Sequence, residues 1–136
     1  MLDLVFAYGT LLSRTPDESV NRLLSHHCRV VASGHVQARL YDLGRFPGAV
    51  PSPHRGDKVY GRLLQFSPIA PALRLIDRYE GYDPRHPEKS EFIRDTIDVA
   101  VPGRSHTVRA WWYFFNGNVR FARRIKTGRW NPPICA

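Results

Sequence analysis

The segment 67–81 constrains the fold most, because its start, its end and its buried face can all be read from the residues. Ser67-Pro68 predicts a helix start, with the serine hydroxyl as the cap and proline in the first turn. Gly81 predicts the end of that helix. Between them, large aliphatic side chains recur four and three residues apart, at Ile69, Leu73 and Ile76. This spacing predicts an amphipathic helix with one face in the core.

Glu80 lies four residues after Ile76, on the same apolar face and in the last helical turn. Burial and the negative end of the helix dipole both disfavour a charged carboxylate there. A carboxyl group whose pKa is raised by burial is a better base near neutral pH than one with a pKa of about 4. Glu80 is therefore the candidate general base. The alternative is a frayed helix end that turns Glu80 to solvent, where it could pair with Arg74 or Arg78.

The chain has 136 residues, of which 43% are hydrophobic. That length predicts a single domain over residues 1–136. The longest apolar run falls short of the about 18 residues that span a bilayer. Met1-Leu2-Asp3 carries no basic segment of the kind that opens a signal peptide. We therefore expect no membrane association and a cytoplasmic location.

Cys28 and Cys135 are the two cysteines, which are too few for a disulfide framework. Cys28 follows His26 and His27, but three adjacent residues cannot all face one metal ion. The sequence offers no spacing typical of a metal site. We therefore expect two idle thiols and no bound metal.

The formal net charge is +8, which raises the question of nucleic-acid binding. The basic residues are scattered, except for a cluster near the end of the chain at Arg120, Arg123, Arg124, Lys126 and Arg129. Aromatic residues precede this cluster, at 111–115. A non-catalytic binding module, for a small molecule or a nucleic acid, is therefore the alternative to an enzyme, although nucleic acid is the less favoured partner. A basic surface also suits anionic small substrates.

The remaining pattern predicts an α+β fold, with several short strands and a few helices. A second helix is expected up to about His26, with Thr15 as its cap and Pro16 in its first turn. Gly44–Gly56, rich in proline and glycine, is expected to be a loop. Strands are expected at 4–8, at 29–43 with a break near Gly34, and at 58–66, 92–101 and 106–115. So many strands in a short chain favour a compact, mixed, barrel-like sheet flanked by the helices.

Three segments carry the clearest motifs. Tyr8-Gly9-Thr10-Leu11 follows a strand, Phe46-Pro47-Gly48 lies in the Pro/Gly loop, and Asp77-Arg78-Tyr79-Glu80-Gly81 closes the helix. In this order and at these distances they resemble the gamma-glutamylcyclotransferase superfamily, including its AIG2-like and YtfP/BtrG-like members. The resemblance continues through Phe92-Ile93-Arg94, Ala110-Trp111-Trp112-Tyr113 and Thr127-Gly128-Arg129-Trp130, and so covers nearly the whole chain.

The resemblance implies cyclisation of a gamma-glutamyl amide to 5-oxoproline, with release of the amine. It makes Glu80 the catalytic base and assigns the glutamyl head group to the turn of Tyr8, Gly9, Thr10 and Leu11. It implies no metal and no other cofactor. Phe46, Pro47, Gly48 and Tyr113 are candidates for lining the pocket, while Asp77 is expected to be solvated or ion-paired.

Two departures from the family pattern are visible. Thr10 replaces the commoner serine, and Phe92 replaces the more usual tyrosine, which removes any hydroxyl role at that position. The leaving amine stays open, because members of the superfamily act on different gamma-glutamyl compounds. The sequence does not determine the oligomeric state.

Overall fold

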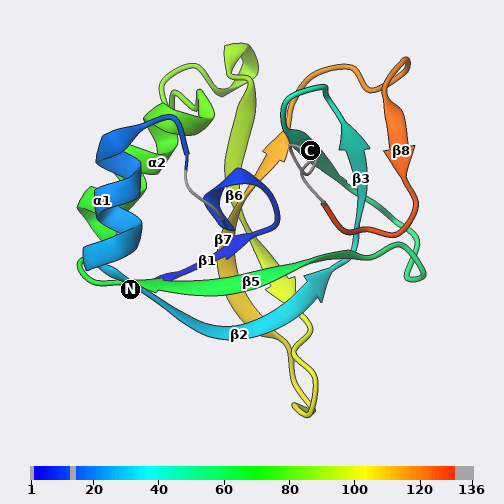
Figure 1. The fold of residues 1–136 in the computed structure, drawn as a ribbon. Helices are drawn as coiled ribbons and strands as arrows, with labels where there is room; N and C mark the ends of the chain where they lie inside the picture. The colour runs from blue at the N-terminus through cyan, green and yellow to red at the C-terminus, as the bar shows by residue number, and fades with distance from the viewer. Residues whose placement is uncertain (1, 13–14, 131–136) are drawn as a thin grey trace, which may run out of the picture.

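The computed structural model describes residues 2–12 and 15–130 (Figure 1). The helices are α1 (Glu18–His26) and α2 (Ile69–Glu80), with short 3-10 turns at Thr10–Leu12 and Pro87–Lys89. The strands are β1 (Leu4–Ala7), β2 (Cys28–Val36), β3 (Ala38–Asp42), β4 (Pro47–Pro51), β5 (Val59–Phe66), β6 (Phe92–Val99), β7 (Val108–Phe115) and β8 (Arg123–Ile125).

The larger sheet has five strands in the order β2-β5-β1-β7-β6. β1 lies at its centre, antiparallel to β5 and parallel to β7. The two helices lie side by side at one end of the molecule, the left in Figure 1. β1 is buried along most of its length because it has neighbours on both edges. Its end therefore delivers the following turn, 8–11, to a fixed place in the fold.

The smaller sheet has three strands in the order β4-β3-β8. The α+β class is confirmed, but the described strands form two sheets and not one closed barrel. The chain leaves the first sheet at Gln37, where its backbone carbonyl accepts a hydrogen bond from the Ser52 N–H and its side-chain amide donates to the Ser52 carbonyl. From that point β3 pairs with β4 and β8 instead of continuing the ladder with β5.

The apolar face of α2 is buried as its spacing predicts. Ile69 is 7% exposed, Leu73 9% and Ile76 0%, and they pack in one cluster with residues of β1 and β5. Gly81 ends the helix in the left-handed region, at a φ of 71°. The last turn of α2 is therefore held against the larger sheet.

Both predicted helix caps are wrong by one or two residues. Asp17, and not Thr15, caps α1, because its carboxylate accepts hydrogen bonds from the N–H groups of Ser19 and Val20. Thr15 is buried and its hydroxyl donates elsewhere, to the Asn21 side chain. Pro68, and not Ser67, occupies the cap position of α2, which has no side-chain cap.

The region 44–56 is a loop only in part, since β4 lies within it. The proline-rich composition hides this strand, but β4 is an edge strand, where a missing N–H can be tolerated.

The chain breaks at Gln37 and not near Gly34. Gly34 lies inside β2, where a Cβ atom would come within 2.6 Å of the Ala100 carbonyl oxygen of the bridging strand segment.

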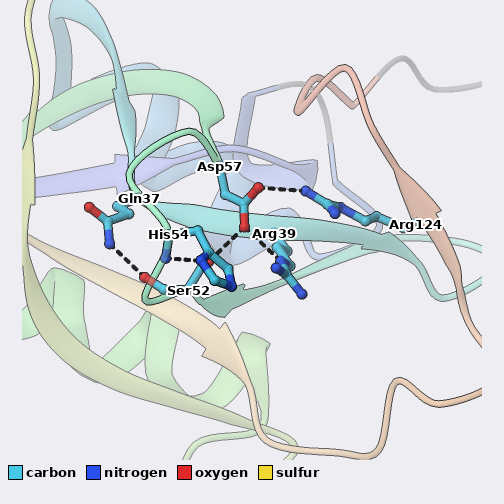
Figure 2. Close-up of polar contacts among 6 residues, drawn as sticks. All are labelled: Gln37, Arg39, Ser52, His54, Asp57 and Arg124. Carbon is cyan, nitrogen blue, oxygen red and sulfur yellow. Dashed lines mark hydrogen bonds and ion pairs between the residues drawn. The ribbon is translucent and has the colours of Figure 1, made fainter.

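A polar network stabilises the smaller sheet (Figure 2). Asp57 accepts hydrogen bonds from Arg39 of β3 at 2.6 Å, Ser52 at 2.7 Å and Arg124 of β8 at 2.8 Å. The hydrogen bond from Ser52, followed by that from Arg39, holds the pKa of the Asp57 carboxyl below its usual range. Arg123 pairs with Asp42 in the same sheet. Two arginines of the basic cluster are thus paired with carboxylates, and β8, like β4, is a strand that the sequence pattern missed.

Within residues 2–12 and 15–130, no helix is long and apolar enough to cross a membrane. Cys28 is half-buried at the start of β2, and Cys135 lies outside the described residues.

Replacing Ile76 by alanine tests the packing of α2. We expect Ile76→Ala to lower the free energy of unfolding by about 2–5 kcal/mol, because it leaves a cavity in a fully buried site. Urea denaturation measures the change. Arg74→Ala, on the exposed face of the same helix, is the matched control. An equal loss in both variants would contradict the packing described here.

Candidate active site

A cavity of about 320 Å³ opens where the end of β1, the β3–β4 loop and the end of α2 meet. Most of the residues predicted for the site line it: Tyr8, Gly9, Thr10, Leu11, Phe46, Pro47, Glu80 and Tyr113. Gly48 is the exception. It lies in β4, where a Cβ atom would contact Leu43 at 2.6 Å and Phe115 at 2.9 Å, so its small size serves packing behind the cavity. The three motif segments are therefore brought together around one space.

Gly9 allows the first two motif segments to touch. A Cβ atom at Gly9 would lie 2.8 Å from the Cγ of Pro47, closer than real side chains approach. Its carbonyl oxygen accepts a hydrogen bond from the Leu12 N–H at 3.0 Å, which closes the turn after β1. The Thr10 hydroxyl lies 2.9 Å from the Tyr79 hydroxyl, so the turn is also tied to α2. Glycine is required here by close approach and not by an unusual φ.

Glu80 lies in the cavity wall and not out in solvent. Burial, with a smaller contribution from the negative charge of Glu91, raises the pKa of its carboxyl from 4.5 to about 8. Among the described residues, no hydrogen bond or ion pair involves the Glu80 side chain. Burial, with a smaller contribution from the charge of Glu80, raises the pKa of the nearby hydroxyls of Tyr8, Tyr79 and Tyr113. A desolvated carboxylate without a partner can accept a proton near neutral pH.

The Tyr8 hydroxyl joins three strands behind the cavity. It donates a hydrogen bond to the Tyr113 carbonyl oxygen of β7 at 2.6 Å and accepts one from the Ala49 N–H of β4 at 3.1 Å. Burial raises its pKa well above the usual range, so it stays protonated. Because both contacts use the hydroxyl, Tyr8 presents its ring and backbone to the cavity.

Asp77 is ion-paired as expected, but it is not solvated. It is 7% exposed, and its carboxylate accepts hydrogen bonds from the Arg94 Nε at 2.8 Å and the Arg94 Nη2 at 3.2 Å. The Tyr113 hydroxyl donates to the same carboxylate at 2.6 Å. The Arg94 guanidinium also stacks on the Trp111 ring, 4.6 Å from its centroid. This cluster ties the last turns of α2, which carry Glu80, to β6 and β7.

The comparisons with known proteins agree with this arrangement. The family described as "Gamma-glutamyl cyclotransferase, AIG2-like" matches residues 5–132. The chain belongs to that family. Among solved structures, an AIG2-like protein from Mus musculus has a TM-score of 0.68 at 21% identity, over 97% of this chain and 97% of that one. No curated protein sequence matches the chain significantly.

Two bacterial structures share the fold. Protein ytfP from Escherichia coli has a TM-score of 0.64 at 22% identity, over 93% of this chain and 95% of that one. YkqA from Bacillus subtilis has a TM-score of 0.63 at 21% identity over 96% of this chain. The present chain spans only 40% of the length of YkqA. Such low identities show a shared fold and leave the activity to be argued from the site.

The structure adds cavity residues that were not among the site residues expected from the sequence. Phe6, Ala7, Pro16 and Tyr79 lie in the wall, and Arg45 and Glu91 are exposed residues at its edge. Arg45 and Glu91 directly precede Phe46 and Phe92, whose rings lie 6.0 Å apart in the wall. Their position next to motif residues was the one sign in the sequence that they lie near the cavity. A charged residue in a loop belongs to no periodic pattern, so its direction could not be predicted.

The contacts of Tyr8 predict a structural role that can be measured. Tyr8→Phe leaves the buried Ala49 N–H and Tyr113 carbonyl without their shared partner, so we expect a loss of about 1–3 kcal/mol in unfolding free energy. Urea denaturation checks this. Tyr60→Phe, which removes the hydroxyl of a tyrosine outside the cavity lining, is the control. An unchanged stability of Tyr8→Phe would show that the hydroxyl does not join the strands.

The raised pKa of Glu80 predicts how stability depends on pH. Between about pH 4.5 and 8 the folded protein holds a proton on Glu80 that the unfolded chain has lost. Folding is therefore weakened by this group as the pH rises through that window. We expect Glu80→Gln to gain stability relative to the wild type between pH 5 and pH 8 in urea denaturation. Glu88→Gln, at an exposed carboxylate, should show no such trend. A constant difference between wild type and Glu80→Gln would rule out the raised pKa.

Proposed function

We propose that this protein cyclises a gamma-glutamyl amide to 5-oxoproline and releases the amine, with Glu80 as the general base. One observation carries the proposal: a carboxyl group with a pKa of about 8 and no partner among the described residues lies in an apolar cavity against the Tyr8–Leu11 turn. Family membership supports the reaction class. We also propose that residues 1–136 form one domain and that the protein acts in the cytoplasm.

The reaction moves two protons from the attacking nitrogen to the leaving nitrogen. Glu80 accepts the first proton from the substrate's α-ammonium group, and the free amine then attacks the γ-carbonyl carbon of the same molecule. A carbon–nitrogen bond forms and closes the five-membered ring. Glu80 gives its proton to the leaving nitrogen, and the bond from the carbonyl carbon to that nitrogen breaks. The ring nitrogen then loses its second proton through Glu80 to the released amine, which departs as an ammonium ion, and Glu80 ends as the carboxylate.

The cavity contributes by confining the substrate. The nucleophile and the carbonyl belong to one molecule, so holding the glutamyl chain in a folded conformation supplies much of the acceleration. A volume of about 320 Å³ suits a small head group. We assign the head group to the turn of Tyr8, Gly9, Thr10 and Leu11, with backbone N–H groups of that turn facing the carbonyl oxygen, where negative charge develops.

The binding-module alternative is less well supported. Part of the basic cluster is neutralised, since Arg123 pairs with Asp42 and Arg124 with Asp57. The remaining positive charge is compatible with an anionic small molecule. We therefore propose a small gamma-glutamyl compound as the partner and regard nucleic acid as the less favoured one.

Replacing Glu80 tests the proposed base. We expect Glu80→Gln to fold normally and to lose 5-oxoproline release by at least about 100-fold, because proton transfer by a general base contributes about that much or more. A panel of gamma-glutamyl compounds scored for 5-oxoproline provides the assay. Glu88→Gln, at an exposed carboxylate outside the cavity, should keep wild-type rates. Undiminished activity in Glu80→Gln would remove this residue from the mechanism.

The pH dependence of the rate provides a separate test. Only the deprotonated carboxylate is a base, so kcat/KM should rise with pH to a plateau, with its midpoint near the Glu80 pKa of about 8. In Glu91→Gln, loss of the neighbouring negative charge should move this midpoint to lower pH. A midpoint near pH 4, or one that Glu91→Gln leaves in place, would contradict the assignment.

A further inference from the structure

Arg45 is the one basic side chain among the described residues that line the cavity, and the same lining includes two acidic ones, Glu80 and Glu91. Both Arg45 and Glu91 are exposed, whereas Glu80 is desolvated. The cavity therefore combines an apolar wall with one positive and two negative groups. An α-amino acid end carries an ammonium and a carboxylate on one carbon. Its carboxylate is complementary to the guanidinium, and its ammonium is complementary to the two carboxyl groups.

The backbone fixes the position of Arg45 at the edge of the cavity. Gly44 and Arg45 form the tip of the β3–β4 hairpin, which is closed by a hydrogen bond from the Leu43 N–H to the Phe46 carbonyl at 3.0 Å. The Gly44 N–H donates to the Asp42 carboxylate at 2.8 Å, and Gly44 has a φ of 107°, which favours glycine. These contacts hold the tip in one conformation.

The residues after the tip pack onto the cavity itself. The Phe46 ring lies 6.0 Å from that of Phe92, and Pro47 packs against Gly9. None of the ion pairs among residues 2–12 and 15–130 includes Arg45. The guanidinium is thus held near the cavity by its backbone while its charge stays available to a ligand.

We propose that Arg45 is a specificity residue that binds the α-carboxylate of the substrate's glutamyl head group. This inference rests on the proposed function and names the residue that distinguishes a gamma-glutamyl amide from an amide without the α-carboxylate. A planar guanidinium binds a carboxylate through two parallel hydrogen bonds, which gives direction as well as attraction. The ammonium is then directed toward Glu80 and Glu91. A carboxylate on the leaving amine is the other group that Arg45 could bind.

Three small compounds separate these cases. Gamma-glutamyl ethylamide has its carboxylate on the head group, 4-aminobutyryl ethylamide has none, and 4-aminobutyryl-alanine has one on the leaving side only. Binding is measured by titration calorimetry on the full-length Glu80→Gln protein, so that no turnover intervenes. The same protein carrying Arg45→Gln, Arg45→Lys or Arg55→Gln is compared with it; Arg55 is an exposed arginine that does not line this cavity.

We expect gamma-glutamyl ethylamide to bind about tenfold more tightly than 4-aminobutyryl ethylamide, as suits a charged hydrogen bond at a partly exposed site. Arg45→Gln should abolish this preference, Arg45→Lys should keep part of it, and Arg55→Gln should keep all of it. The inference is overturned if the preference survives Arg45→Gln, if no gamma-glutamyl compound binds, or if Arg45→Gln weakens only 4-aminobutyryl-alanine.

Turnover by the wild-type protein separates this inference from the proposed function. With Glu80 present, Arg45→Gln should raise the KM for gamma-glutamyl ethylamide about tenfold and leave kcat nearly unchanged, since the lost contact is made equally in the ground and transition states. An Arg45-dependent binding preference without any 5-oxoproline would uphold the Arg45 assignment and refute cyclisation. If the wild type and Arg45→Gln both cyclise the substrate with the same preference among the compounds, the proposed function is upheld and the Arg45 assignment is refuted.

Discussion

The buried carboxylate of Asp77 joins α2 to both β6 and β7. Arg94 of β6 and the Tyr113 hydroxyl of β7 both donate to it, and the Tyr113 carbonyl accepts from Tyr8 at the end of β1. The Tyr8 hydroxyl in turn accepts from the Ala49 N–H in the smaller sheet. One chain of hydrogen bonds therefore links the last turns of α2 to both sheets, and the cavity walls cannot move independently.

This arrangement gives two carboxylates, three residues apart on one helix, opposite surroundings. Asp77 has a guanidinium and a hydroxyl as partners, whereas Glu80 lies in a desolvated wall with the charge of Glu91 nearby. A helix end disfavours negative charge at both positions. The ion pair offsets that cost at Asp77 and fixes the helix, whereas at Glu80 burial, with a smaller contribution from the charge of Glu91, raises the pKa. The Asp77 contacts thus hold in place the helical turn that carries the proposed base, as a preorganised site requires.

The sequence predicted the elements whose signals are local. The stripe of Ile69, Leu73 and Ile76 and the stop at Gly81 lie within fifteen residues, so the position of Glu80 in the wall of the cavity, partly covered, could be expected from spacing. The burial of Asp77 could not, because its partners lie 17 and 36 residues away. β4 was missed because an edge strand tolerates the prolines that usually mark a loop. The two sheets were not distinguished from one curled sheet, because the break at Gln37 depends on its contacts with Ser52.

The helix that carries Glu80 and the loops that carry Arg45 and Glu91 differ in how freely their side chains could vary. The proposed base, Glu80, lies on a helix that the Asp77 cluster holds to the larger sheet, so its position is fixed by buried contacts. Arg45 and Glu91 lie in exposed loops whose side chains can change with little effect on packing. The close contact between Gly9 and Pro47 still holds the hairpin that carries Arg45 against the turn of residues 8–11. Variation at the hairpin tip would therefore alter the charge at the edge of the cavity while Glu80 keeps its position, which would separate the choice of substrate from the proposed chemistry.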